Sequence, residues 1–155
     1  MQAFVAAHED CFRRELGIGH VTGSAWVLSP DRRRVLLTHH RKLDLWLQLG
    51  GHADGEWDVR LVALREAREE SGLVRVRLLA DAIFDVDVHS IPARAREPAH
   101  FHYDVRFVCE ADDVEPLVVS DESHDLAWVE LDRVAVLSAD RSVLRMVRKS
   151  LALRA

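Results

Sequence analysis

Residues 50–73 read GGHADGEWDVRLVALREAREESGL, a pair of glycines followed by a charged segment with helical periodicity. The pattern predicts a helix from about Asp58 to Ser71. Glu66, Glu69 and Glu70 are spaced i, i+3 and i+4, so their carboxylates share one face of this helix. Because like charges on one face repel each other, helix stability alone does not favour them. A bound divalent cation would turn this repulsion into attraction.

The residues around these three carboxylates support a cation site. Carboxylate oxygens suit hard ions such as Mg²⁺ and Mn²⁺, which commonly bridge to substrate phosphates. Arg65 precedes Glu69 by four residues, so its guanidinium can pair with that carboxylate and fix its orientation. Gly72 stands where a helix commonly has its C-terminal cap. The alternative is a solvent-facing, salt-bridged helix face, which is the commoner origin of such charge patterns.

This segment resembles the signature of the Nudix hydrolases, G-x5-E-x7-R-E-U-x-E-E-x-G-U with U aliphatic. In the first half, Glu56 falls in place when counted from Gly50, but eight residues instead of seven separate it from Arg65. The departure concerns the role of Glu56 and leaves the spacing of the three carboxylates intact. With the order of the expected elements, the resemblance covers most of residues 20–137. The second half matches the signature at Arg65, Glu66, Glu69, Glu70, Gly72 and Leu73, with Ala67 at an aliphatic position.

The resemblance implies a metal-dependent pyrophosphohydrolase that acts on a nucleoside diphosphate linked to another moiety. It implies that Glu66, Glu69 and Glu70 hold one or more Mg²⁺ ions, with Mn²⁺ as an alternative, and that a main-chain carbonyl of Gly50 or Gly51 completes the coordination. The general base is a carboxylate of the helix, Glu69 or Glu70, or one of the later loop, Asp121 or Glu122. A solvated acidic turn is the alternative for that loop. The expected catalytic set is therefore Arg65, Glu66, Glu69, Glu70 and Glu122.

A second polar pattern follows in two alternating segments, Ile83–Ser90 and Ala99–Cys109, which predict an antiparallel hairpin across residues 91–98. Its polar side chains would form one patch, with His89 near His100, Asp87 near His102 and Asp85 near Asp104. The patch is either a solvated sheet face or a wall of the substrate site or a second metal site, where imidazole and carboxylate favour Mn²⁺ or Zn²⁺. Arg94 and Arg96 in the loop could clamp phosphates. The expected substrate-binding set is Asp87, His89, Arg94, Arg96, His100 and His102.

The remaining pattern predicts one domain over residues 1–155. An N-terminal helical segment is expected within 1–17, with its pattern over 2–15, and a C-terminal one within 138–155, with its pattern over 140–153. Short apolar strands lie between them without a regular strand–helix alternation, which favours the α+β class. The resemblance implies an α/β/α sandwich, with a mixed β-sheet packed between helices.

Composition excludes several classes of protein. The chain has 155 residues, 48% of them hydrophobic and 30% charged, and its formal net charge is −5. A chain this acidic is a poor general binder of nucleic-acid backbones, and no apolar run has the roughly 18 residues of a membrane span. Cys11 and Cys109 form no CxxC pair, and the first residues lack the apolar core of a signal peptide, so we expect a cytoplasmic protein.

Three functions are compatible with these patterns. The first is the Nudix-type hydrolase, whose partner is a small-molecule nucleoside diphosphate derivative and which would act as a monomer or a homodimer. The second is a diphosphate isomerase on the same scaffold, which neither cysteine is placed to support. The third is a catalytically silent nucleotide-binding module, although such modules tend to lose motif carboxylates that this chain keeps. Phosphate release with and without Mg²⁺ separates turnover from binding alone.

Overall fold

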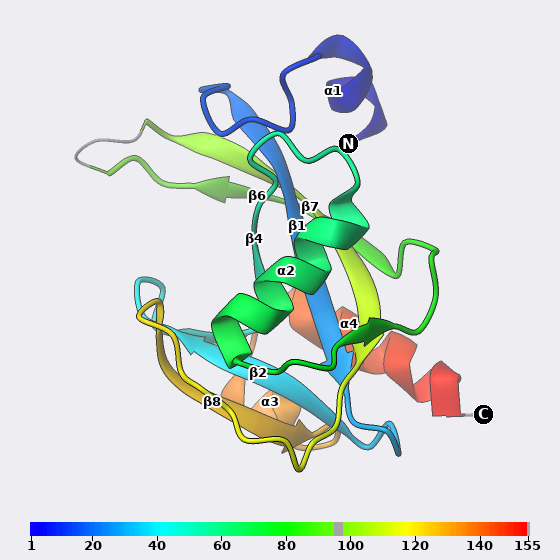
Figure 1. The fold of residues 1–155 in the computed structure, drawn as a ribbon. Helices are drawn as coiled ribbons and strands as arrows, with labels where there is room; N and C mark the ends of the chain where they lie inside the picture. The colour runs from blue at the N-terminus through cyan, green and yellow to red at the C-terminus, as the bar shows by residue number, and fades with distance from the viewer. Residues whose placement is uncertain (95–97, 155) are drawn as a thin grey trace.

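A computed structural model describes residues 1–94 and 98–154 (Figure 1). The helices are α1 (Gln2–Ala7), α2 (Val59–Ser71), α3 (Val134–Leu137) and α4 (Arg141–Leu151), followed by a 3₁₀ turn over Ala152–Arg154. The strands are β1 (Gly19–Leu28), β2 (Arg34–His40), β3 (Leu45–Leu47), β4 (Leu49–His52), β5 (Arg77–Leu78), β6 (Asp85–Ile91), β7 (His100–Glu110) and β8 (Ser123–Glu130). None of the helices in the described part of the chain is long and apolar enough to cross a membrane.

The strands form one mixed sheet centred on β1. This strand pairs parallel with β7 along its whole length, from Gly19 opposite Phe101 to Leu28 opposite Glu110. It also pairs antiparallel with β2 and β4, while β6 pairs antiparallel with β7 and β8 with β2. The predicted α+β class with a mixed sheet is therefore confirmed.

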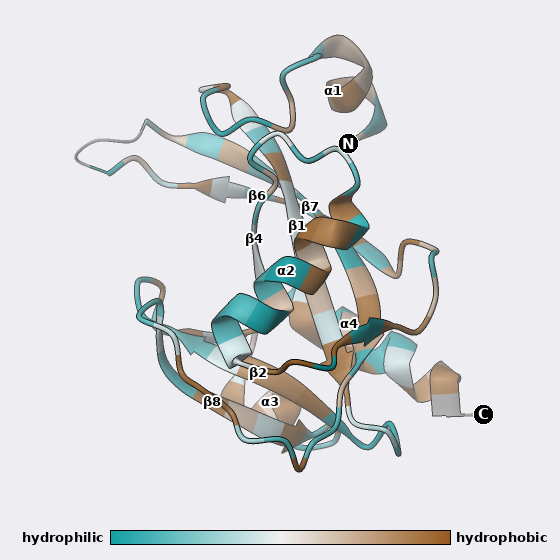
Figure 2. Cartoon of the chain, viewed as in Figure 1, coloured by the Kyte–Doolittle hydropathy of each residue, from teal (hydrophilic) through white to brown (hydrophobic). Residues whose placement is uncertain are grey.

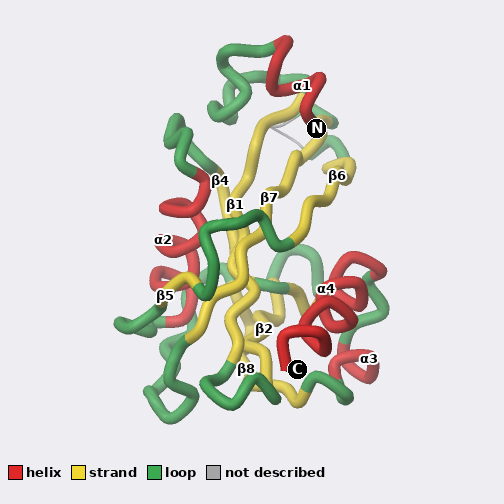
Figure 3. Tube along the Cα trace, turned by 90° about the vertical axis from the view of Figure 1, so that its right-hand side faces the viewer, coloured by secondary structure: helices red, strands yellow, loops and turns green. Residues whose placement is uncertain are grey.

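Helices cover both faces of the sheet (Figure 3), with α2 on one side and α3 and α4 on the other. Each face has its own apolar core. Ala25 and Val27 of β1 face the α2 side with Ala63 and Ala67, whereas Trp26 belongs to the α4 side. Every residue of β1 is buried, as expected for a central strand covered on both faces.

Helix α2 changes character along its length (Figure 2), from apolar in its first turns to hydrophilic in its last. Its N-terminal cap is Asp58, whose side chain accepts a hydrogen bond from the Arg60 amide at 3.2 Å. It ends at Gly72, which adopts the left-handed conformation with φ 73°. Both predicted ends of this helix are confirmed.

The N-terminal helix is shorter than predicted. Helix α1 ends at Ala7 because His8 is extended, and successive turns over residues 8–18 replace the expected helix. Apolar spacing of three or four residues also suits such turns, which bury Cys11 by another route. Phe4 stacks on Tyr103 of β7 with ring centroids 3.7 Å apart.

Two further features concern β4 and α4. Gly50 and Gly51 lie within β4, opposite Ser24 and Gly23 of β1. In α4, Met146 is fully buried, whereas Leu151 is 51% exposed. Both cysteines are free and buried, and burial raises the pKa of the Cys109 thiol to about 12.

Candidate active site

The C-terminal half of α2 lies against the glycines of β4. Residues Ala63 and Ala67 on one side of the helix are buried, and their small side chains allow a close approach to the sheet. A Cβ atom placed on Gly51 would lie 2.5 Å from Oε2 of Glu66. Glycine at this position therefore makes room for a carboxylate beside the main chain of β4.

Arg65 holds Glu66 in place. Its Nη2 atom donates to Oε1 of Glu66 and to the carbonyl oxygen of His52, each at 2.7 Å. The predicted i, i+4 partner, Glu69, is farther away, with 3.9 Å between Arg65 Nε and Glu69 Oε2. The predicted ion pair with Glu69 is therefore present, but the shorter contact is with Glu66, which the sequence did not predict, because the guanidinium reaches back to β4.

Glu70 is the most buried of the three carboxylates. Its side chain accepts a hydrogen bond from the Gly50 amide at 3.3 Å, and the residue is only 6% exposed. Burial raises the pKa of Glu70 to about 8, helped by the charges of Glu66, Glu122 and Glu69 and opposed by the Gly50 amide. Burial likewise raises the pKa of Glu66, while Arg65 opposes that shift.

The position of these carboxylates on the helix is costly without a cation. Glu69 and Glu70 lie in the last turn of α2, where the helix dipole disfavours negative charge. Two of the three carboxylates are also partly removed from water, which disfavours their charged form. A cluster of repelling oxygen donors, packed against the main chain of Gly51, fits a hard divalent cation such as Mg²⁺.

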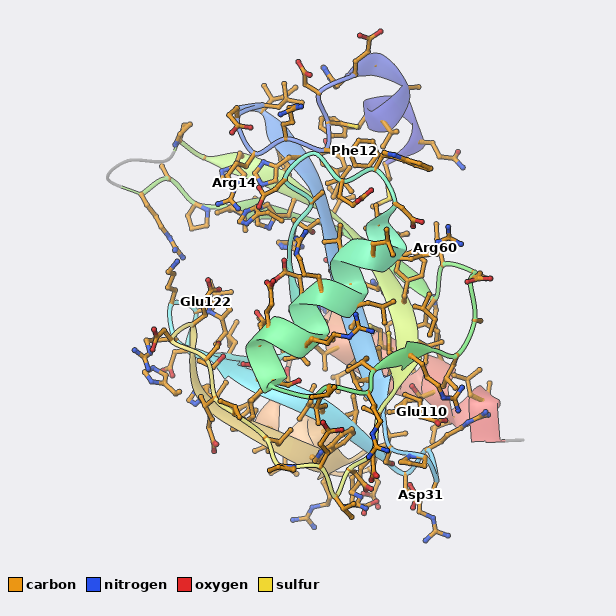
Figure 4. All side chains as sticks on the ribbon, in the orientation of Figure 1. Phe12, Arg14, Asp31, Arg60, Glu110 and Glu122 are labelled. Carbon is orange, nitrogen blue, oxygen red and sulfur yellow. The ribbon has the colours of Figure 1, made fainter. Side chains whose placement is uncertain are left out.

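Glu122 faces the same site from another element. Figure 4 shows it on the loop before β8, beside α2. Its charge contributes to the raised pKa of both Glu66 and Glu70, as expected for a nearby carboxylate. Its carbonyl accepts a hydrogen bond from the Arg41 amide at 2.9 Å, which ties this loop to the end of β2. Glu122 is exposed, so its carboxylate is open to water.

Glu56 has a local partner at the entrance to α2. Its Oε1 atom accepts a hydrogen bond from the Asp58 amide at 2.9 Å, one residue before the helix begins. This contact fixes the loop where the spacing of the signature is shifted.

The second polar pattern lies on one face of β6 and β7, as predicted, but in a different register. His89 pairs with His102, Asp87 with Asp104, and Asp85 with Arg106, two residues away from the expected pairing. The connecting loop begins later in the chain than predicted, because Ile91 still belongs to β6 and pairs with His100. A shift of two residues preserves the side to which each side chain points, so the patch survives the wrong register.

One half of this patch is a buried ion-pair network under α4. Asp85 and Arg106 are each 2% exposed at the side chain, with 3.4 Å between Oδ2 and Nη1. Arg145 of α4 donates to Asp85 at 2.7 Å and to Asp87 at 3.1 Å. The solvated alternative is thus wrong for this half, and Asp87 is engaged by Arg145 instead of standing open to a ligand.

The other half of the patch gathers histidines. His20 of β1 lies 5.0 Å from His100 and 4.8 Å from His102, measured between ring centroids. His52 of β4 lies 5.0 Å from His20, and His89 lies 5.5 Å from His102. Sequence reasoning missed His20 and His52, because the pairings of β1 with β7 and of β4 with β1 bring them here.

Of the two arginines predicted to clamp phosphates, Arg96 lies outside the described residues. Arg94 is exposed, and its charge helps to lower the pKa of His40 at the end of β2, behind the larger effect of burial. Glu122 acts on the same histidine with the opposite sign. Arg94 and Glu122 therefore both act electrostatically on His40.

Comparison with known proteins identifies the domain. The family model described as NUDIX domain matches residues 20–149. No curated protein matches the chain in sequence.

Solved structures agree in fold at low identity. A NUDIX family hydrolase from Clostridium perfringens superposes with a TM-score of 0.69 at 21% identity, over 86% of this chain and 97% of that one. A C. elegans Ap4A hydrolase in a binary complex gives a TM-score of 0.67 at 16% identity, over 86% and 96%. The NUDIX domain of Shewanella oneidensis NrtR, crystallised with ADP ribose, gives 0.62 at 15% identity, over 99% and 98%.

Proposed function

The chain belongs to the Nudix domain family, and we propose that it is a Mg²⁺-dependent pyrophosphohydrolase. This enzyme class, the hydrolases that act on acid anhydrides, is the one that the sequence predicts. Its substrate is a nucleoside diphosphate linked to another moiety, cleaved at a phosphoanhydride bond. Mn²⁺ fits the same oxygen donors.

One observation carries the proposal: Glu66 and Glu70 are held against the main chain of Gly50 and Gly51. The carboxylate of Glu66 fills the space that a side chain on Gly51 would need, and Glu70 accepts from the Gly50 amide. We assign the cation to Glu66, Glu69 and Glu70, with a carbonyl of Gly50 or Gly51. Such an ion, when bound, neutralises charge on the phosphoryl oxygens and lowers the pKa of water.

The protein groups divide the remaining work. Arg65 keeps Glu66 directed at β4 through its paired hydrogen bonds. The exposed carboxylates of Glu69 and Glu122 can receive a proton from the attacking water, whereas Glu70 is too buried to meet bulk solvent. We therefore favour Glu69 or Glu122 as the general base and Glu70 as a ligand.

The substrate side is proposed to be Arg94, Arg96 and His89, while His100 and His102 are assigned to the second-metal alternative of the same patch. A guanidinium suits phosphate oxygens because it donates in a planar fork. The charges of Arg94 and Glu122 both act on His40, which supports a position of Arg94 on the same side of the molecule as Glu122. Structures of similar fold hold ADP ribose or belong to an Ap4A hydrolase, which supports a nucleotide derivative as the ligand.

Compartment and assembly are proposals of the same kind. Two buried free thiols suit the reducing cytoplasm. A homodimer is compatible with the fold, and the concentration dependence of the sedimentation coefficient tests it.

The experiment is hydrolysis of a nucleotide panel by wild type and Glu69→Gln. The panel holds a dinucleoside polyphosphate, ADP ribose and a nucleoside triphosphate, each with Mg²⁺ and with EDTA. Loss of one charged ligand costs about 3–4 kcal/mol of transition-state stabilisation, or roughly 10²–10³ in rate. The variant should keep its melting temperature in EDTA, since Glu69 is 63% exposed at the side chain and repels its neighbours.

Glu9→Gln is the control, because Glu9 is an exposed carboxylate in the N-terminal turns, far along the chain from α2. It should hydrolyse the panel at the wild-type rate. Unchanged Mg²⁺-dependent turnover in Glu69→Gln would mean that the helix face is only a solvated surface. Tight binding of a nucleotide by wild type without any turnover would favour the silent module instead.

A further inference from the structure

Three imidazoles from two strands meet on the face of the sheet opposite α2. His100 and His102 point to the same side of β7 because they are two residues apart, and His20 pairs with His102 in the parallel register of β1 and β7. One ring nitrogen from each of His20, His100 and His102 can be chosen so that all lie within 4.8 Å of one another. We call these three residues the histidine cluster.

Two members of the cluster are buried, and the third, His102, is half-buried. His20 is 2% exposed and His100 is 5% exposed. Three neighbouring imidazoles repel one another whenever two of them are protonated, and they add less to an apolar core than aliphatic side chains would. Packing alone therefore gives little reason for this choice of residues.

We propose that His20, His100 and His102 form a nitrogen-donor site for a transition-metal ion of the Zn²⁺ type, separate from the oxygen-donor site on α2. Neutral imidazoles are common ligands of Zn²⁺, and a site of three histidines leaves a fourth position for water or another group. Mg²⁺ prefers oxygen ligands, so the two sites select different ions.

The geometry of the rings suits this role. Tetrahedral Zn²⁺ with bonds of about 2.0–2.1 Å holds its ligand nitrogens about 3.3 Å apart. Nε2 of His100 and Nε2 of His102 are already 3.2 Å apart. A nitrogen of His20 lies within 4.8 Å of nitrogens on both of these rings, so an ion would have to draw His20 closer.

A second contact orients His100 as metal ligands are usually oriented. Its Nδ1 atom lies 2.9 Å from the carbonyl oxygen of Pro98, which can only accept a hydrogen bond. Nδ1 must therefore carry the proton, and Nε2 presents its lone pair to His102. A histidine that donates one N–H to a carbonyl and binds metal through the other nitrogen is the usual arrangement around protein-bound zinc.

His102 lies at the centre of the histidines on this face. Its ring centroid is 4.8 Å from that of His20, 5.1 Å from that of His100 and 5.5 Å from that of His89.

His52 connects the cluster to the site on α2. Its ring lies 5.2 Å from that of His102, edge to face, and it directly follows Gly51 in β4. Its carbonyl accepts from Arg65, which also holds Glu66. An ion in the histidine cluster would hold β1 and β7 together next to β4, close to the main chain that supports the carboxylates.

The test is metal binding by the full chain after chelation and dialysis. Zn²⁺ is titrated by calorimetry, and Co²⁺ is added separately to look for the visible bands of a four-coordinate nitrogen site. Wild type should bind one high-affinity equivalent of Zn²⁺ and give the Co²⁺ bands. His102→Gln and His20→Asn should lose that equivalent and the bands while keeping the far-ultraviolet circular dichroism of wild type.

The matched control is His124→Ala. His124 forms a pair with His39, with ring centroids 5.3 Å apart, but among the described residues no third histidine completes that pair into a cluster. This variant should bind Zn²⁺ as wild type does. Glu69→Gln should also retain the Zn²⁺ equivalent, so the failure of one site is distinguishable from the failure of the other.

Two results would overturn the proposal. Wild type that shows neither a high-affinity Zn²⁺ equivalent nor Co²⁺ bands has no such site, whatever the variants do. Zn²⁺ binding that persists in both folded variants but disappears in Glu69→Gln would place the ion on α2.

Discussion

The carboxylate face of α2, formed by Glu66, Glu69 and Glu70, and the histidine cluster of β1 and β7 make an instructive pair. The first is contiguous in sequence, because helical spacing puts i, i+3 and i+4 side by side. The second joins residues about eighty positions apart, because β1 pairs in parallel with β7. In each region, the grouped side chains contribute little to the stability of the fold in the absence of a ligand.

Burial acts on both regions with opposite sign. It raises the pKa of Glu70 to about 8 and lowers that of His102 to about 3. In each case the neutral form is favoured, as expected where water is excluded. A cation must therefore displace a proton from Glu70 but not from His102, and this difference can be measured.

The largest expected effect is that of Glu70→Gln. Because the folded pKa of Glu70 lies above its ordinary value of 4.5, its contribution to the free energy of unfolding is fully present below pH 4.5 and is lost as pH rises through about 8. Without metal, wild type should therefore become less stable across that range, and the variant should lose part of this slope. Turnover with Mg²⁺ should fall roughly 10²–10³-fold.

Denaturant titrations in EDTA at several pH values, with activity measured alongside, check this outcome. A variant that retains both the wild-type slope and the wild-type activity would place Glu70 outside the metal site. Zn²⁺ binding by the histidine cluster should be the same in both proteins.

Gly51→Ala tests the close approach of β4 to the helix. The added Cβ would lie 2.5 Å from Oε2 of Glu66, so the carboxylate must move. We expect turnover to fall by roughly 10–10²-fold, about 1.4–2.7 kcal/mol, with little change in the melting temperature. Gly17→Ala is the control, since a Cβ there meets nothing within 4 Å. Equal activity in the two variants would contradict the role of Gly51 in making room for the Glu66 carboxylate.

Arg145→Met should affect stability without affecting either site. Arg145 donates to Asp85, whose side chain is 2% exposed. Loss of this ion pair should lower the free energy of unfolding by only about 1–2 kcal/mol, because Lys149 and Arg106 still pair with Asp85. Burial opposes the lowered pKa of Asp85, but Arg145 and Lys149 outweigh it. This stabilisation is present above the ordinary aspartate pKa and is lost as pH falls through the lowered one, so the two proteins should converge in acid.

Chemical denaturation at pH 7 and in acid measures this difference. Arg148→Met, an exposed arginine of the same helix, should be nearly neutral. A loss of Mg²⁺-dependent turnover in Arg145→Met would show that the ion-pair network supports the active site.

The smallest expected effect is that of Glu56→Ala. Glu56 accepts from the Asp58 amide at 2.9 Å, a contact worth about 0.5–1 kcal/mol. Turnover should stay within about threefold of wild type, since so small a free energy corresponds to less than a factor of ten. A much larger loss in a steady-state assay would mean that Glu56 acts in catalysis despite the shifted spacing.

The sequence by itself determined the helix of residues 59–71, its cap at Gly72, its shared carboxylate face and the sidedness of the β6–β7 hairpin. These depend on the fixed periods of helix and strand, which act over a few residues. Only the tertiary structure decided that Arg65 holds Glu66, that α4 buries Asp85, and that His20 joins His100 and His102. The parallel pairing of β1 with β7 depends on how the two apolar cores pack, and no local period encodes it.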